Sequence, residues 1–273
     1  VHALRGVSLQ IGAGQFVAVG EKGVILSSPD GRLWSPRASG SSVRLRGVTF
    51  GSGLFVAVGD EATVLLSHDG QQWWSASATP SSGHPARFAT VGAIEMRFLA
   101  VGDAGAFASS DFPPVIWTLS SDRIPPSDWR GVAEGLGQVV MVGSEGVRGS
   151  RANLEGFSLR SPAEIKDLEA VTFGRERFVA VGLAGAAATS KDSLTWTSTR
   201  TGSSTHLRGV TVFNGLFVAV GDLGSVLTSP DGAVWSPRPS VSTANLRSVA
   251  ASPLAAVAVG AQGTLLVSSR ADL

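Results

Sequence analysis

The sequence contains no cysteine, which excludes disulfides, zinc–thiolate sites and a cysteine nucleophile but leaves the redox compartment open. It also lacks an excess of either charge, because 22 Lys and Arg residues are balanced by 21 Asp and Glu residues. A nucleic-acid-binding protein needs a basic surplus to contact phosphates, so we expect no nucleic-acid partner. With 43% apolar and 16% charged residues, the chain has a globular composition and can bury a sizeable core.

Signals for a membrane span, a metal or a nucleotide are missing as well. The uncharged stretch 250–269 is interrupted by proline and glycine and fits the repeat described below, so we expect no membrane span. The four histidines show no H-x-x-x-H pairing, and no acidic group has the spacing of a calcium loop. No G-x-x-x-x-G-K-[ST] loop occurs either. The sequence therefore predicts neither a metal nor a cofactor.

What the chain does contain is one motif repeated seven times. Each copy reads L-R-G-V, a short gap, F-V-A-V-G-D-x-G, four residues rich in β-formers or alanine, and then S-x-D-G-x-x-W before a polar linker. The glycines that close "VAVG" are spaced 39 to 43 residues apart, and they are Gly20, Gly59, Gly102, Gly143, Gly182, Gly221 and Gly260. The copies start near residues 4, 45, 88, 129, 168, 207 and 246.

Four short apolar runs in each copy predict four β-strands, because the runs are too short for helices and are separated by glycine or Asp-Gly turns. Repeated four-stranded units of about 40 residues are typical of β-propeller blades. We therefore expect an all-β, seven-bladed propeller of antiparallel blades that forms a single domain over residues 1–273. The seventh copy stops before its fourth strand, so either the last blade has three strands or the native chain is longer; we expect the second.

Aromatic residues recur at the start of the fourth strand. We expect them to pack between blades, since buried aromatics contribute strongly to packing. They are Trp34, Trp73, Trp117, Phe157, Trp196 and Trp235.

The turn that precedes these aromatics resembles a known family. "SSPDGRLW", "LSHDGQQWW", "TSKDSLTW" and "TSPDGAVW" look like shortened Asp-boxes of the bacterial-neuraminidase-repeat propellers. Together with "FVAVGDxG" they resemble the photosystem II stability and assembly factor family. The resemblance implies the propeller fold but does not specify a function, because similar propellers serve as glycosidases, lectins and scaffolds. Physically, the aspartates build turns by accepting backbone N–H groups, and these residues are Asp30, Asp69, Asp192 and Asp231.

The sequence argues against an enzyme. Sialidases of this fold class use a tyrosine nucleophile, and the chain has no tyrosine. Other glycosidases need two facing carboxylates about 5 to 10 Å apart, whereas the acidic residues here mostly occupy equivalent turns of different repeats. Related xyloglucan-cleaving enzymes place their carboxylates between two propellers, and one propeller is present. We expect no catalytic residues.

A set of arginines is the feature of the sequence that most suggests a binding site. The second residue of the first strand is arginine in five copies, with Ala89 and Glu169 in the other two: Arg5, Arg46, Arg130, Arg208 and Arg247. In a propeller these positions would converge around the axis and attract anions. Alternatively, they pair with acids in the turns after "VAVG" and lock blades together; those acids are Glu21, Asp60, Asp103 and Asp222.

Two tryptophans outside the repeated aromatic position are further candidates. Trp129 precedes Arg130, and Trp74 follows Trp73. Because successive strand residues point to opposite faces, one of Trp73 and Trp74 would be exposed and could contact a sugar or a protein. For each of them, packing is the competing interpretation.

These observations predict a non-enzymatic scaffold that binds a protein partner and helps a larger complex to assemble or remain stable. The alternative is a glycan-binding module or the propeller part of a glycoside hydrolase. The chain begins at Val1 without a signal-peptide pattern, so we expect any leader to lie outside this sequence. By analogy with the family, we expect an extracytoplasmic location: periplasmic, surface or secreted.

Overall fold

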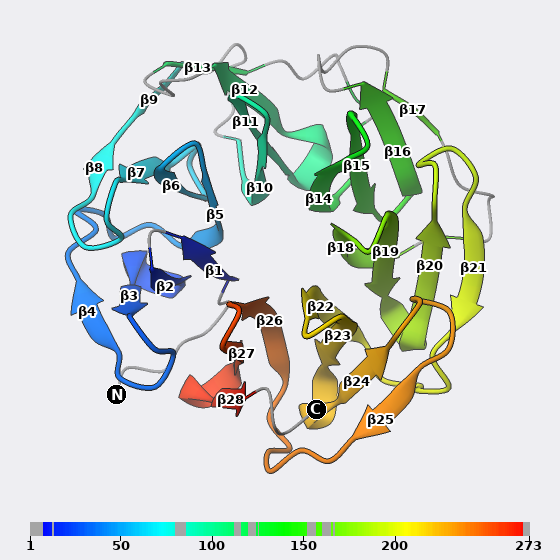
Figure 1. The fold of residues 1–273 in the computed structure, drawn as a ribbon. Coiled ribbons are helices and arrows are strands. Elements are labelled where there is room, and N and C mark those ends of the chain that lie inside the picture. Colours follow the sequence, from blue (N-terminus) through cyan, green and yellow to red (C-terminus); the bar gives the residue numbers. More distant parts are fainter. Residues whose placement is uncertain are drawn as a thin grey trace. The chain divides into compact units, whose positions relative to one another are not determined.

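The structure, a computed structural model, describes residues 8–12, 14–79, 86–111, 116–119, 124, 126–151, 157–159, 165 and 167–269 (Figure 1). Each of the seven repeats folds into its own sheet, called a blade below, and no α-helix occurs among the described residues. This confirms the predicted all-β fold with seven blades.

In each blade the strands follow the order of the chain. Blade 1 contains β1 (Ser8–Gly12), β2 (Gln15–Val19), β3 (Ile25–Ser28) and β4 (Ser35–Arg37). Blade 2 contains β5 (Leu45–Gly51), β6 (Leu54–Gly59), β7 (Val64–Ser67) and β8 (Trp74–Ser75). Blade 3 contains β10 (Phe88–Ile94), β11 (Arg97–Gly102), β12 (Phe107–Asp111) and β13 (Ile116–Leu119). Blade 4 contains β14 (Trp129–Gly135), β15 (Gln138–Gly143), β16 (Gly146–Arg151) and β17 (Ser158–Leu159).

The last three blades follow the same strand order. Blade 5 contains β18 (Leu168–Gly174), β19 (Arg177–Gly182), β20 (Ala186–Ser190) and β21 (Thr197–Arg200). Blade 6 contains β22 (Leu207–Phe213), β23 (Leu216–Gly221), β24 (Val226–Ser229) and β25 (Ser236–Arg238). Blade 7 has three described strands, β26 (Leu246–Ala251), β27 (Ala255–Gly260) and β28 (Leu265–Ser269). The uncharged stretch 250–269 thus lies in strands, and no described helix is long and apolar enough to cross a membrane.

Contacts divide the chain into two compact units, residues 2–129 and residues 130–273. Blades 1 to 3 belong to the first unit and blades 5 to 7 lie in the second, which also holds blade 4 from Arg130 onward. The expectation of one domain over residues 1–273 stays a prediction.

Blade 2 departs from the expected four-strand pattern at its fourth strand. The expected strand "QWWSAS" is reduced to β8, which covers Trp74 and Ser75. The chain then forms β9 (Ser77–Thr79), which pairs in parallel with β13 and makes a fifth strand of the blade 3 sheet. Pairing with β9 covers the edge of β13, so that its backbone groups are satisfied.

Neighbouring blades pack face to face through apolar layers. In the layer between blades 5 and 6, called the 5–6 layer, Val179 and Val181 of β19 meet Phe217, Leu227 and Trp235 of blade 6. Equivalent phenylalanine and tryptophan pairs occur in other blades: Phe55 with Trp73, Phe98 with Trp117, and Phe178 with Trp196. The prediction that the repeated tryptophans pack between blades is confirmed at these positions.

Glycine allows this close packing at the ends of the first strands. A Cβ atom on Gly12 would lie 1.9 Å from Cγ of Phe50 in the next blade, and one on Gly135 would lie 2.3 Å from Cγ of Phe173. Blade 6 reverses this arrangement, because Phe213 occupies the glycine position and packs against Ala251 and Ala256 of blade 7.

The turns before the fourth strands are built by aspartate, as the sequence predicts. In blade 6, Asp231 Oδ1 accepts the backbone N–H groups of Ala233 at 2.9 Å and of Val234 at 3.0 Å. The indole N–H of Trp235 donates to the carbonyl oxygen of Gly232 at 3.1 Å. The same bonds form around the other three turn aspartates, Asp30, Asp69 and Asp192.

Candidate functional site

The arginines of the repeat occupy a special backbone position, which the sequence did not reveal. Pairing between the first and second strands skips one residue in five blades, which marks a β-bulge. The skipped residues are Arg46, Ala89, Glu169, Arg208 and Arg247. A bulge takes its residue out of the ladder and redirects the side chain. This explains how a charged residue can follow a buried leucine in an otherwise apolar strand.

In the unit 2–129, the arginine at the bulge is neutralised. Arg46 Nε lies 2.7 Å from Asp60 Oδ1, an ion pair whose angles do not fit a hydrogen bond, and Arg46 Nη1 donates to Asp103 Oδ2 at 3.0 Å. Asp60 follows the "VAVG" glycine of the same repeat, whereas Asp103 comes from the next repeat. This group, called the Arg46 cluster, joins blades 2 and 3 and matches the expectation of a lock between blades.

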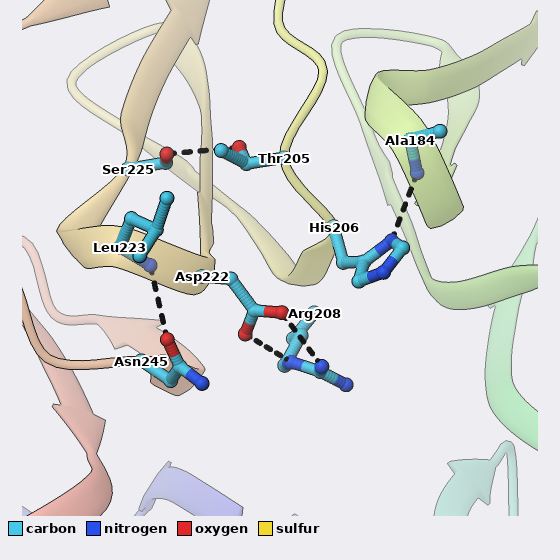
Figure 2. Close-up of polar contacts among 8 residues, drawn as sticks. All are labelled: Ala184, Thr205, His206, Arg208, Asp222, Leu223, Ser225 and Asn245. Atoms are coloured by element: carbon cyan, nitrogen blue, oxygen red, sulfur yellow. Dashed lines mark hydrogen bonds and ion pairs between the residues drawn. The ribbon is translucent and has the colours of Figure 1, made fainter.

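In the unit 130–273, charged residues form a row along neighbouring first strands. Arg130 Nη1 lies 3.3 Å from Glu169 Oε1, which links blades 4 and 5. Arg208 forms a bidentate pair with Asp222, with distances of 2.6 Å from Nε and 2.8 Å from Nη2 (Figure 2). We call Arg130, Arg208 and Arg247, together with Glu169 and Asp222, the arginine row.

Each partner of the bidentate pair holds the other in its charged form. The hydrogen bond from Arg208 lowers the pKa of Asp222, and burial partly opposes this shift. The hydrogen bond to Asp222 raises the pKa of Arg208, with Glu169 adding a smaller electrostatic effect. The positive charge of Arg247 also lowers the pKa of Asp222. Glu169 of blade 5 and Arg247 of blade 7 thus each exert a small electrostatic effect on the pair in blade 6.

Arg247 differs from the other arginines at this position. Arg247 is exposed, and its side chain makes no ion pair or hydrogen bond with any described residue. The row contains three arginines and two carboxylates, so it keeps one positive charge. An exposed guanidinium of this kind can bind a carboxylate through two parallel hydrogen bonds.

A second set of contacts joins neighbouring blades. In three of the turns after "VAVG", a non-glycine residue with positive φ donates its N–H to the side chain of the residue that precedes the next blade's first strand. Ala184 N–H donates to His206 Nδ1 at 3.0 Å, and Leu223 N–H donates to Asn245 Oδ1 at 3.0 Å (Figure 2). Asp128 accepts the N–H of Ala104 in the same way in the other unit, at 3.1 Å.

The sequence analysis overlooked these cap residues because their side chains differ from copy to copy. What they share is a side-chain acceptor atom at one template position, directly before the residue that starts the first strand: Trp129, Leu207 or Leu246. This shared acceptor is the sequence signal that could have identified them. Since His206 accepts at Nδ1, its ring carries a proton at Nε2 when this bond forms.

The remaining predicted site residues fall into three different environments. Trp129 is fully buried, because it fills a core position that leucine holds in other blades, and we leave it out of the site. Trp74 is 42% exposed and contacts the His68 ring in a tilted arrangement with ring centroids 5.1 Å apart, which confirms that one residue of the Trp73–Trp74 pair faces solvent. Arg5 lies outside the described residues. Convergence of all five arginines around one axis stays a prediction.

The described residues offer little to a metal. No group of three or more His, Cys, Asp or Glu side chains is arranged to hold an ion in the part of the chain that the structure describes. The turn carboxylates Asp60 and Asp103 share the guanidinium of Arg46. The chemistry that this arrangement supports is ionic recognition of an anionic group.

Comparisons with known proteins identify the fold. No protein-family profile matches the chain, and no curated protein matches it in sequence. Solved structures do match. A structure of YCF48 bound to a D1 peptide superposes with a TM-score of 0.77 and 18% identity over 98% of this chain and 93% of that chain. YCF48 from Cyanidioschyzon merolae gives 0.74 and 18% over 98% and 96% of the two chains.

A propeller from another group matches almost as well. The WD40 β-propeller domain of Doa1 superposes with a TM-score of 0.70 and 12% identity over 97% of this chain and 94% of that chain. At these low identities the likeness shows the fold alone. The chain is a seven-bladed β-propeller similar in structure to YCF48.

Proposed function

We propose that this propeller is a non-enzymatic scaffold that uses the arginine row to bind an anionic segment of a protein partner. The observation that carries the proposal is Arg247, an exposed guanidinium without an acidic partner among the described residues, next to two arginines that are already paired. A glutamate, an aspartate or a chain-terminal carboxylate would complete it.

Leu223 adds an apolar contact to the same surface. It is 70% exposed, and its φ of 56° is unfavourable for a leucine. Its N–H is bound by Asn245, two residues before Arg247. We infer that the partner segment carries an apolar residue beside its carboxylate.

Similarity to YCF48 supports protein binding. One of the matching structures holds a D1 peptide, and we infer the same general activity here, binding of a polypeptide segment. We further propose that this binding assists assembly or stability of a larger complex outside the cytoplasm. We also propose that the turns before the fourth strands are related to Asp-boxes, as their sequences suggest.

The test is a low-salt pull-down from the native host with the wild-type chain and the Arg247→Glu variant, followed by mass spectrometry. Arg247→Glu reverses the unpaired charge and leaves both ion pairs of the row in place. Arg200→Glu is the matched control, since Arg200 is exposed on the fourth strand of blade 5. We expect a protein that the wild type and the control retain and Arg247→Glu loses, with binding that weakens as salt rises.

Identical partner lists for all three proteins would contradict the proposal and leave the arginines a purely structural role. A glycan screen would then test the alternative, in which exposed Trp74 stacks on a sugar. Trp74 has small polar counterparts in other blades, Ser35, Thr197 and Ser236, so a set of repeated sugar sites is not favoured.

A further inference from the structure

One of the three caps between blades depends on a group that titrates near neutral pH. His206 Nδ1 accepts the N–H of Ala184 at 3.0 Å, so this cap needs a ring without a proton on Nδ1 (Figure 2). The equivalent acceptors are the amide of Asn245 and the carboxylate of Asp128. Neither of these groups gains a proton between pH 8 and about pH 5.5, whereas an imidazole ordinarily does.

Other copies of the repeat carry a counterpart of each protonation state at this position. Asn245 is a neutral acceptor, as the unprotonated imidazole is. Arg44 and Arg87 directly precede β5 and β10, where they are exposed and carry a positive charge without an acceptor atom. The fold thus accommodates both a neutral cap and a cation at one template position, and a histidine can be either.

His206 also lies next to the arginine row. Its carbonyl oxygen accepts the N–H of Asp222 at 2.9 Å, and Arg208 follows two residues later in β22. The pKa of Asp222 is lowered mainly by Arg208 and to a smaller extent by the charges of His206 and Arg247. A proton on His206 therefore acts on the same carboxylate that neutralises Arg208.

The elements around His206 determine what its protonation does. The turn 183–185, which His206 caps, and the linker 201–205 contain no titratable side chain. The charged residues on the surrounding elements are Asp167, Glu169, Arg208, Asp222 and Arg247. The last four belong to the arginine row, which already keeps one positive charge. A protonated His206 adds a second one.

We propose that protonation of His206 opens the cap on Ala184 and strengthens binding of an anionic partner segment at the arginine row. The effect on binding rests on the function proposed above. At higher pH the neutral ring accepts the N–H of Ala184. Uptake of a proton at Nδ1 ends this hydrogen bond, because both ring nitrogens then carry hydrogen, and places a positive charge beside Asp222. Affinity for an anion therefore rises as the pH falls.

The first measurement uses the protein alone and compares two caps within it. Amide exchange at Ala184 and Leu223 is measured by NMR at about pH 8 and about pH 5.5, on either side of the ordinary titration of histidine, and is expressed as protection relative to the unfolded chain at each pH. We expect protection at Ala184 to fall about fivefold at the lower pH and protection at Leu223, capped by Asn245, to stay the same. In His206→Asn, Ala184 should behave as Leu223 does.

The second measurement is partner binding at the same two pH values. The low-salt pull-down compares wild type with His206→Asn and His206→Arg, and His68→Asn is the matched control, since His68 is exposed in the turn between β7 and β8. We expect the wild type and the control to retain about two- to tenfold more partner at the lower pH, because one charge is added at a partly exposed site. His206→Asn should lose this increase, and His206→Arg should bind strongly at both pH values.

Thermal unfolding at both pH values establishes that each variant is folded. Equal protection at Ala184 at the two pH values would overturn the proposal, and so would the same pH dependence of binding in wild type and His206→Asn. Failure of the proposed function gives a different result. If Arg247→Glu retained every partner, the arginine row would bind none of them, and the exchange measurement would still decide whether the cap opens.

Discussion

The two faces of blade 6 are built from the same repeat and are packed very differently. On the face toward blade 5, Phe217, Leu227 and Trp235 fill the space against two valines of β19. On the face toward blade 7, Ala256 replaces the phenylalanine, and a groove remains. The difference shows that each layer needs contributions from both blades. A blade with full strands still borders a groove when its neighbour carries alanine in place of the phenylalanine.

The largest effect is expected where the layer is full. Phe217 is completely buried, and Phe217→Ala should lower the free energy of unfolding by about 3–5 kcal/mol, since the ring is lost and a cavity remains. Urea unfolding followed by tryptophan fluorescence measures this change. Arg200→Ala, at an exposed position, is the control and should change stability by about 0.5 kcal/mol or less. A cost for Phe217→Ala below about 1 kcal/mol would mean that the 5–6 layer collapses around the lost ring.

A matched pair of leucines compares the two layers directly. Leu227 and Leu266 occupy the same repeat position, but Leu227 is 4% exposed and Leu266 is half-buried beside the groove. Leu227→Ala should cost about 2–5 kcal/mol. Leu266→Ala should cost about 1 kcal/mol, because less apolar surface leaves water and the groove already exists. Equal costs in urea unfolding would show that the groove is closed in solution.

The caps on either side of blade 6 should contribute less. His206 binds the N–H of Ala184 toward blade 5, and Asn245 binds the N–H of Leu223. Replacing either residue by alanine should cost about 1 kcal/mol and speed hydrogen exchange at the freed N–H. Asn245→Asp keeps an acceptor and should retain protection. If the alanine variants left exchange at Ala184 and Leu223 unchanged, water would replace the side chain at no cost.

The smallest expected effect on stability concerns the aspartate turns that precede the fourth strands. Hydrogen bonds from the N–H groups of Thr195 and Leu194 lower the pKa of Asp192 to about 2, against the opposing effect of burial. A carboxyl whose pKa is lower in the folded state stabilises the protein above the unfolded value of about 3.9. We expect this contribution to be lost as the pH falls from about 4 toward 2. Asp192 is exposed, so the change is small.

Acid titration of stability for the wild type and Asp192→Asn tests this expectation. The asparagine variant should be less stable at neutral pH, and the difference between the two proteins should shrink as the pH approaches 2. A constant difference across that range would show that the turn is held by Ser190 and the backbone and not by the carboxylate charge.

Much of the fold followed from local patterns in the sequence. The strand boundaries follow the apolar runs closely, as at β6 over Leu54–Gly59, because a run of that length between glycines can form little else. The turn aspartates were predicted with their partners, since an Asp-x-x-Trp turn bonds within a few residues. Strand β9 could not be predicted, because its pairing with β13 depends on a neighbouring sheet.

The repeat predicted which positions the candidate site residues occupy, but not how each side chain is paired or exposed. The repeat identified Arg46, Arg208 and Arg247 as equivalent, and nothing in the sequence distinguished them. The structure makes Arg46 doubly paired, Arg208 bidentate and Arg247 exposed. Glu169 was noted as a replacement for arginine, and the structure shows it as the partner of Arg130.

The number of blades, the order of strands and the chemistry of each turn follow from local sequence patterns, because hydrogen bonds and side-chain alternation within a blade depend on residues close in the chain. Tertiary structure decided which charges pair, which backbone N–H groups are capped from the next blade and where a groove remains. Those outcomes depend on two blade faces about 40 residues apart in the chain, and a missing aromatic on one of them opens space that no local pattern records.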